Sequence, residues 1–254
     1  MSSEAVRLGP GCEVIADLHL DPADPVACGS FAAWLGERRD LKRLVILGDL
    51  FDAWVGPAHA QLEGARLVLD GLRGVTDRGA AVDLLWGNRD FLLDDKIAAL
   101  AGAKLHGDAL VAAGEQGERV LFIHGDELCT LDTAYQRLRR VLRSRWVTGA
   151  LLNLPLWVTL RIAKKLRDKS RRSVGAKAPE EMAMQEDVVT RLAGEYGADV
   201  LVCGHAHRWR DGLTQAGVRW IVLDAFGGER DFLSHRGHEG LVGGSSGFDR
   251  RSGG

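Results

Sequence analysis

The chain has 254 residues, of which 46% are hydrophobic and 27% are charged, and its formal net charge is −2. This balance is typical of a globular protein and predicts one large domain, or one domain with an inserted element. Its longest uncharged run, residues 146–160, is interrupted by Pro155 and is shorter than the roughly 20 residues that span a bilayer. We therefore exclude a membrane-spanning helix there, although the run could lie on a membrane surface.

The basic residues are concentrated in one segment. Residues 131–175 contain 12 Lys or Arg against two Asp, whereas the rest of the chain has 21 basic and 33 acidic residues. We expect this segment to meet an anionic partner or, alternatively, to form solvated helical faces. The first residues lack the apolar stretch of a signal peptide. The four cysteines show no paired spacing, so we expect a reducing, cytoplasmic environment.

Short apolar runs alternate with helical patterns along the chain. Because the runs are almost continuously apolar, they predict strands buried on both faces, and hence a layered α/β domain. Gly114 and Gly117 bracket a predicted hairpin turn. We expect strands at 12–18, 43–50, 81–86, 108–114, 119–125 and 198–204, a late hairpin over 212–224, and helices at 26–39 and 58–73.

Residues 131–175 break this alternation. Their pattern predicts two or three helices without an intervening strand, which we interpret as an inserted basic helical lid. The α/β domain would then comprise residues 1–130 and 176–239. The Gly/Ser-rich residues 240–254 predict a disordered tail.

Polar side chains follow five of the predicted strands. In open α/β sheets, binding sites form just beyond the carboxyl ends of the strands, so these side chains are expected to meet at one edge. Any one of them could instead be an ordinary turn or cap residue, but together they predict a metal site. His59, His106, His235 and His238 fall outside such contexts and are expected on the surface or in the core. The candidate ligands are Asp17, His19, Asp49, Asn88, His124, His205 and His207.

The chemistry of these ligands indicates the metal. Asp, Asn and His without Cys suit divalent ions such as Mn²⁺, Fe²⁺ or Zn²⁺, of which we expect Mn²⁺. Seven ligands are too many for one such ion but fit two ions that share a carboxylate. Such a pair activates water for attack on a phosphate and stabilises the leaving oxygen. The pattern therefore predicts a hydrolase of phosphate esters or anhydrides.

The motifs DLHL, GDLFD, GNRD, HGD and GHAH occur in this order over roughly residues 10–225. In this the chain resembles the calcineurin-like metallophosphoesterases, which implies a four-layer αββα sandwich. The resemblance implies that Asp17, His19, Asp49 and His207 hold the first ion. It also implies that Asp49, Asn88, His124 and His205 hold the second, with Asp49 as the bridge.

Longer motifs narrow the resemblance. GDLFDAWVG, GNRDFL and HGDELCTLDTAYQ are similar to those of the UDP-2,3-diacylglucosamine pyrophosphatases of lipid A biosynthesis, which release UMP and an acylated sugar phosphate. Arg89 stands where the larger family usually has His; since arginine keeps its proton, we expect a bidentate phosphate clamp. The resemblance implies catalytic roles for Arg89, Asn88 and His124. It implies substrate contacts by Asn88, Arg89, Asp132, Ser170, Lys177 and His205.

Some residues depart from that subfamily pattern. Trp209 replaces Pro in GHAHRW, residues 222–232 read VLDAFGGERDF in place of a segment ending LGDW, and Val174 replaces Asn. Lys177 is either a substrate contact or an exposed linker residue. Two alternatives stay open: a related hydrolase for another nucleotide-linked or lipid-linked phosphate, and a non-catalytic metal-binding scaffold. We expect an acylated UDP-sugar substrate and peripheral attachment to the anionic inner face of the cytoplasmic membrane. We expect neither a nucleic-acid partner nor an obligate protein partner.

Overall fold

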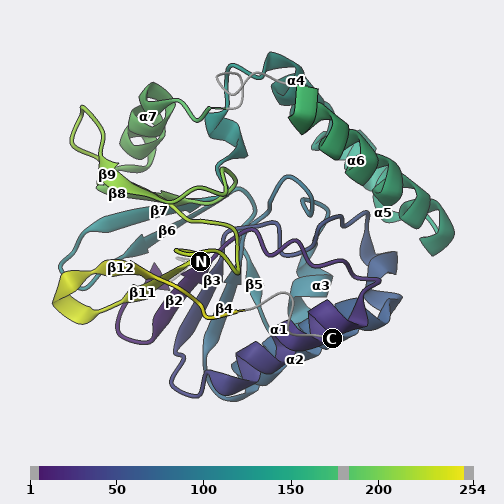
Figure 1. Ribbon diagram of the computed structural model, residues 1–254, viewed down its shortest axis with the longest axis horizontal. Helices are drawn as coiled ribbons and strands as arrows, with labels where there is room; N and C mark the ends of the chain where they lie inside the picture. Colours follow the sequence, from purple (N-terminus) through teal and green to yellow (C-terminus); the bar gives the residue numbers. More distant parts are fainter. Residues whose placement is uncertain (1–5, 177–182, 249–254) are drawn as a thin grey trace.

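The computed structural model describes residues 6–176 and 183–248; of residues 168–176 only the backbone is described. Two six-stranded sheets pack face to face, with helices on their outer sides (Figure 1). Helix α7 (Glu186–Tyr196) covers one sheet, whereas α1 (Pro25–Glu37) and α2 (Glu63–Asp77) cover the other. The prediction of a four-layer αββα sandwich is therefore confirmed.

The first sheet has the strand order β1-β6-β7-β8-β10-β9. Strands β7, β8 and β10 run parallel to one another. Strand β6 forms an antiparallel hairpin with β7, and β9 forms one with β10, as the turn residues predict. The strands are β1 (Val6–Arg7), β6 (Ala109–Ala113), β7 (Arg119–Ile123), β8 (Val200–Cys203), β9 (Arg210–Leu213) and β10 (Arg219–Val222).

The second sheet has the order β12-β11-β2-β3-β4-β5. Strands β2 to β5 are parallel, with Val14 opposite Val45 and Val45 opposite Asp83. The strands are β2 (Cys12–Ile15), β3 (Arg43–Ile46), β4 (Ala81–Leu84), β5 (Lys104–Leu105), β11 (Phe232–His235) and β12 (Leu241–Gly244).

The helices of the sandwich bury one apolar face each. Aliphatic and aromatic side chains of the first two helices pack against the second sheet, and those of α7 pack against the first. A third apolar cluster, which includes Val14, Leu47 and Phe122, fills the space between the sheets. The helices are α1 (Pro25–Glu37), α2 (Glu63–Asp77), α3 (Asp95–Leu100) and α7 (Glu186–Tyr196), with the short 3₁₀ helices η1 (Pro57–Gln61), η2 (Asp126–Leu128) and η3 (Gly237–Glu239).

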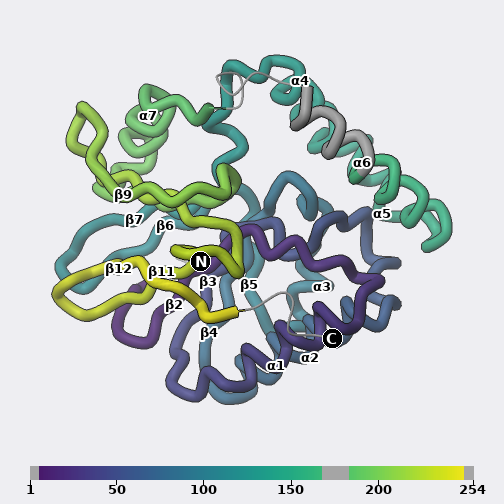
Figure 2. The backbone as a smooth tube through the Cα atoms, in the orientation of Figure 1, coloured from purple at the N-terminus to yellow at the C-terminus, as the bar shows by residue number. Residues whose placement is uncertain are grey.

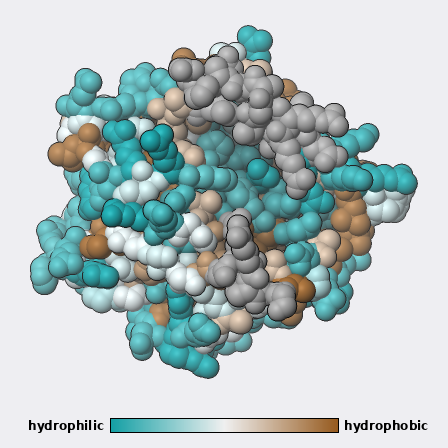
Figure 3. All heavy atoms as spheres, in the orientation of Figure 1, coloured by the Kyte–Doolittle hydropathy of each residue, from teal (hydrophilic) through white to brown (hydrophobic). Residues whose placement is uncertain are grey.

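Residues 133–176, called the insertion below, form three consecutive helices that lie apart from the two sheets in Figure 1. Its helices are α4 (Thr133–Leu142), α5 (Arg145–Leu152) and α6 (Leu156–Ala176). Most of the face in Figure 3 is hydrophilic. The insertion nevertheless exposes large apolar side chains, among them Trp146 at 90% and Trp157 at 60%. Within the described residues, no helix combines the length and apolarity that crossing a membrane requires.

The prediction of a disordered tail from residue 240 is wrong for its first part. Leu241–Gly244 form β12, which pairs with β11 and buries Leu241. The chain then continues along the second sheet to α1, where Trp34 Nε1 donates to the carbonyl oxygen of Ser246 (Figure 2). Glycine and serine contribute to a sheet through backbone hydrogen bonds, which composition does not reveal. Residues 249–254 lie outside the described part.

Candidate metal centre

The seven candidate ligands follow strands β2, β3, β4, β7 and β8, and their loops meet at one edge of the sandwich. Five of them have a left-handed backbone with φ between 49° and 67°. This conformation is sterically unfavourable for residues with a Cβ, although Asp and His adopt it more often than most. The loops therefore turn sharply at the ligands themselves. These residues are Asp17, His19, Asp49, His205 and His207.

Two glycines allow these loops to approach each other. A Cβ on Gly87 would lie 2.0 Å from Asp49 Oδ1, and a Cβ on Gly204 would lie 2.4 Å from Asp17 Oδ2. Both distances are far below van der Waals contact, so any side chain would displace a candidate ligand. The loops that follow β4 and β8 thus pack directly against the two carboxylates.

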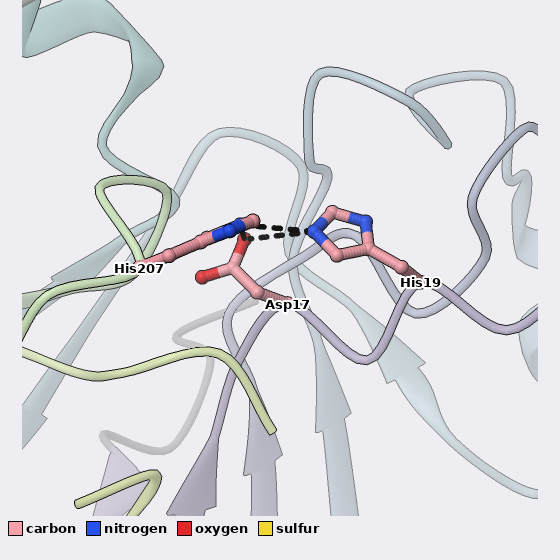
Figure 4. A group of neighbouring side chains, drawn as sticks. All are labelled: Asp17, His19 and His207. Carbon is pink, nitrogen blue, oxygen red and sulfur yellow. Dashed lines mark hydrogen bonds and ion pairs between the residues drawn. The ribbon is translucent and has the colours of Figure 1, made fainter. Parts of the chain in front are cut away.

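One group of ligands comprises Asp17, His19 and His207 (Figure 4). The Nε2 atoms of His19 and His207 lie 3.0 Å apart, and Asp17 Oδ1 lies 3.5 Å from His207 Nε2. Asp17 is fully buried, whereas His207 is exposed. This group therefore opens toward solvent on its His207 side.

A second group forms around Asn88, whose Oδ1 lies 2.8 Å from His124 Nε2 and 3.1 Å from His205 Nδ1. Since Nδ1 of His124 lies 2.9 Å from the carbonyl oxygen of Leu47, it must donate there, so in the neutral imidazole Nε2 carries the lone pair that can bind a cation. Asp49 lies between the groups: its Oδ2 is 3.6 Å from His19 Nδ1 and 3.7 Å from His124 Nε2. Asp17 also reaches both groups.

The donors fit divalent ions in spacing and charge. Ligand atoms about 2.1 Å from one ion lie about 3 Å from each other in an octahedral shell, close to the separations seen here. Burial, together with the charges of Asp90 and Asp17, raises the pKa of Asp49 to about 7 despite the opposing charge of His124. A cation bound beside these carboxylates would favour their ionised forms. Divalent cations would supply that charge.

The histidines respond in opposite directions. Burial would lower the pKa of His124, but Asp49 and Asp17 outweigh burial and raise it to about 9. Burial and the charge of His124 instead lower the pKa of His205 to about 4. Burial opposes ionisation of Asp17 as well, yet its hydrogen bond with His207 and the charge of His124 bring its pKa below the usual value. Within the centre, Asp17 thus favours its anionic form, His124 its protonated form and His205 its neutral form.

Arg89 lies beside these groups, with its Nε 3.5 Å from Asp49 Oδ2 and its backbone N–H donating to Asp49 Oδ1 at 2.9 Å. Its carbonyl oxygen accepts a hydrogen bond from the backbone N–H of Trp54. The guanidinium is only partly exposed, which places it at the edge of the metal centre. It can therefore meet an anion held there.

Sequence reasoning assigned no role to two buried acids. Asp90 accepts hydrogen bonds from the backbone N–H groups of Gly87, Asp49 and Phe51, and so ties two ligand loops together. Asp126 accepts from Tyr135 and from Arg139 Nε at 2.7 Å, which joins the loop of His124 to α4. In the sequence, only their positions in the GNRD and HGD motifs could have indicated that Asp90 and Asp126 have a role in the site.

The remaining residues expected to contact substrate lie in or near the insertion. Asp132 is buried and caps α4, since its Oδ1 accepts from the backbone N–H of Tyr135 at 3.0 Å. Ser170 lies on α6, where only the backbone is described, and Lys177 lies outside the described residues. The four other histidines are in the core or at the surface, as expected. His59 and His235 are buried, His106 is half-buried against Asp83, and His238 is exposed.

A model of calcineurin-like phosphoesterases matches residues 14–209. The chain belongs to the calcineurin-like phosphoesterase family. Its members use a dimetal centre, and the candidate ligands of one lie together here. The predictions of the family, of the fold and of a hydrolase are confirmed.

This phosphoesterase is similar to curated UDP-2,3-diacylglucosamine hydrolases. The protein from Ectopseudomonas mendocina is 39% identical over 201 residues, which cover 77% of this chain and 80% of that protein. The protein from Ralstonia nicotianae is 38% identical over 229 residues, with 86% and 85% covered. Among solved structures, a dimetal phosphatase from Danio rerio aligns with a TM-score of 0.46 at 15% identity, covering 93% of this chain and 97% of that one.

Proposed function

We propose that this phosphoesterase hydrolyses the pyrophosphate bond of UDP-2,3-diacylglucosamine to UMP and 2,3-diacylglucosamine 1-phosphate, a step of lipid A biosynthesis. The observation that carries the proposal is the convergence of seven metal-ligand side chains beside Arg89. Identities of 38–40% to curated UDP-2,3-diacylglucosamine hydrolases over most of the chain support the substrate.

In this proposal Asp17, His19, Asp49 and His207 hold one divalent ion. The other is held by Asp49, Asn88, His124 and His205. The position of Asp49 Oδ2, within 3.7 Å of a histidine from each set, supports its role as the shared ligand. We propose Mn²⁺ as the native metal, with Fe²⁺ and Zn²⁺ as alternatives. When bound, such a pair activates water and neutralises charge on the reacting phosphate.

The side chains of the protein orient the substrate. The planar guanidinium of Arg89 can donate two parallel hydrogen bonds to a phosphate while Asp49 holds it in place. Asn88, on the same loop as Arg89, would contact the reacting phosphate together with His124 and His205, because the ligand atoms of these three residues lie within 3.2 Å of one another. Asp132 would contact the glucosamine portion, and Ser170 and Lys177 would also contact the substrate.

The helical insertion would shelter the acyl chains. Its exposed tryptophans and its basic residues are the features of a surface that rests on an anionic membrane. We therefore propose that the protein works in the cytoplasm, attached peripherally to the inner face of the membrane. It would need no nucleic acid and no obligate protein partner for this activity.

A second candidate is hydrolysis of another nucleotide-linked or lipid-linked phosphate. It is favoured by two of the departures from the subfamily pattern, Trp209 and residues 222–232. The backbone N–H of Phe226 donates to the carbonyl oxygen of Ala16, adjacent to Asp17. Trp209, close behind His207, packs against the apolar cluster between the sheets, with the guanidinium of Arg230 over its ring. These residues could reshape the site beside the first ion.

An activity panel distinguishes the two candidates. Purified protein with Mn²⁺ is assayed against UDP-2,3-diacylglucosamine, UDP-glucose, CDP-diacylglycerol and a phosphoprotein. We expect the highest kcat/KM on UDP-2,3-diacylglucosamine, with UMP as a product. A higher kcat/KM on another substrate would favour the second candidate.

A further inference from the structure

Besides the contacts of α4 with Asp126, two arginines connect the insertion to the metal-ligand loops. We propose that Arg143, at the end of α4, and Arg167, on α6, are positioning residues that hold these loops in place, so that hydrolysis of any phosphodiester depends on the seated insertion. The insertion would then be part of the catalytic machinery as well as a cover for the acylated substrate. The inference rests on the proposed dimetal hydrolase but not on its acylated substrate.

Arg143 holds the loop that carries Asn88 and Arg89. Its Nη2 donates to the carbonyl oxygen of Gly87 at 3.2 Å, one residue before Asn88. Its Nη1 pairs with Asp108, and only 13% of the side chain is exposed. Burial lowers the pKa of Arg143 to about 10, although the charges of Asp90 and Asp49 favour its protonated form. Arg143 therefore contacts the ligand loop as a mostly shielded cation.

Arg167 holds the loops that follow β2 and β3. Its Nη1 lies 3.1 Å from Asp52 Oδ1 and 3.1 Å from Asp21 Oδ2. Asp21 comes two residues after His19, and Asp52 comes three residues after Asp49. The loops are also joined by a backbone hydrogen bond from Asp52 to Leu20. One guanidinium on the insertion thus ties down both loops that supply carboxylates to the centre.

These arginines act beside the other attachments of the insertion: Tyr135 and Arg139 of α4 bind Asp126, and α6 packs on η1. In the described structure, neither α4 nor α5 contains a buried residue. On α6, Thr159 and Ala163 are buried.

Truncation of Arg143 leaves the carbonyl oxygen of the buried Gly87 without its donor, which costs more than the loss of an exposed ion pair. Truncation of Arg167 removes the cation between Asp21 and Asp52, whose like charges then repel each other. The ligand loops would then relax.

The test uses a small soluble substrate that no acyl-binding surface can affect. The variants Arg143→Ala and Arg167→Ala are compared with Arg140→Ala and Arg161→Ala, which remove exposed arginines from the same parts of the insertion. Hydrolysis of bis(p-nitrophenyl) phosphate is measured with saturating Mn²⁺. We expect kcat to fall on the order of 10- to 100-fold for the first two, since small displacements of reacting groups have effects of this size. The KM and the two control variants should change little.

Two further measurements separate positioning from folding. Circular dichroism melts identify variants that are folded at the assay temperature, and Arg143→Lys and Arg167→Lys provide milder changes. Arg167→Lys should recover most of the kcat, because an ammonium group can still pair with both carboxylates. Arg143→Lys should recover less, because it loses the planar fork that serves Gly87 and Asp108 together.

Folded variants that keep wild-type kcat on the small diester would overturn the proposal, as would a loss confined to acylated substrate. A different result would contradict the proposed function and leave the role of the arginines intact: the wild type would hydrolyse the diester but not UDP-2,3-diacylglucosamine. Deletion of the whole insertion is less informative, because it removes the cover and both arginines at once.

Discussion

The side-chain oxygen of Asn88 lies 2.8 Å from Nε2 of His124. Asn88 follows β4 of the second sheet, and His124 follows β7 of the first. Leu47, after β3, accepts a hydrogen bond from the other nitrogen of the same imidazole. The candidate metal centre therefore lies where the two sheets meet, and loops from both sheets contribute ligands to it.

Metal removal should abolish activity. We expect EDTA to silence hydrolysis of a chromogenic phosphodiester and Mn²⁺ to restore it, because the carboxylates alone cannot activate water. Asp49→Ala should remove activity that Mn²⁺ does not restore, because both ligand groups lose the carboxylate between them. His238→Ala, at an exposed position, serves as the control. Full activity of metal-free protein would contradict the dimetal interpretation.

Arg89→Lys should impair catalysis although it conserves the charge. The planar fork is lost, so we expect a cost on the order of 2–4 kcal/mol in transition-state stabilisation, the range for removal of one oxyanion donor. The cost is measured as the ratio of kcat/KM to wild type on UDP-2,3-diacylglucosamine. Arg66→Lys, on the exposed side of α2, is the matched control. A variant within twofold of wild type would exclude the phosphate clamp.

His59→Ala should affect stability more than chemistry. His59 is 1% exposed, contacts the ring of Trp54 with centroids 5.6 Å apart, and lies in η1, against which α6 packs. Truncation leaves a cavity in this contact, so we expect a loss of about 1–3 kcal/mol in the free energy of unfolding. Urea unfolding measures the loss, and His238→Ala should stay within about 0.5 kcal/mol of wild type. Equal free energies of unfolding for His59→Ala and wild type would show that η1 and α6 are not tightly packed against each other.

Trp146→Ala should weaken binding to membranes. We expect the wild type to sediment with anionic vesicles at low ionic strength and to leave them at about 0.5 M salt, since the attraction decays within a Debye length. Trp146 is 90% exposed and contributes the apolar part of this surface. Leu213→Ala removes a side chain 68% exposed on β9, outside the insertion, and should bind like wild type. If the same fraction of protein sedimented with vesicles at every salt concentration, electrostatic attraction to the membrane would be ruled out.

The sequence predicted the candidate ligands because each follows an apolar run, and parallel strands bring such positions to one edge. It could not predict the contacts of Arg143 with Gly87 or of Arg167 with Asp52. These join segments 56 and 115 residues apart, and they depend on how the insertion folds back onto the sandwich. Strand β12 was missed for a different reason: Val242 and its glycine neighbours pair through their backbones, whatever their side chains.

The left-handed backbone at five ligand positions lowers the stability of the fold, whereas the side chains at these positions are needed for activity. Such conformations cost roughly 1–3 kcal/mol each in residues other than glycine, and the surrounding loops must hold them there. In a library selected only for heat resistance, these positions should drift toward glycine. In a library selected for turnover they should keep their donors, and Val, Ile and Thr should be absent from both. The two selections would diverge at Asp17, His19, Asp49, His205 and His207, so thermostable descendants of this enzyme must gain their stability elsewhere.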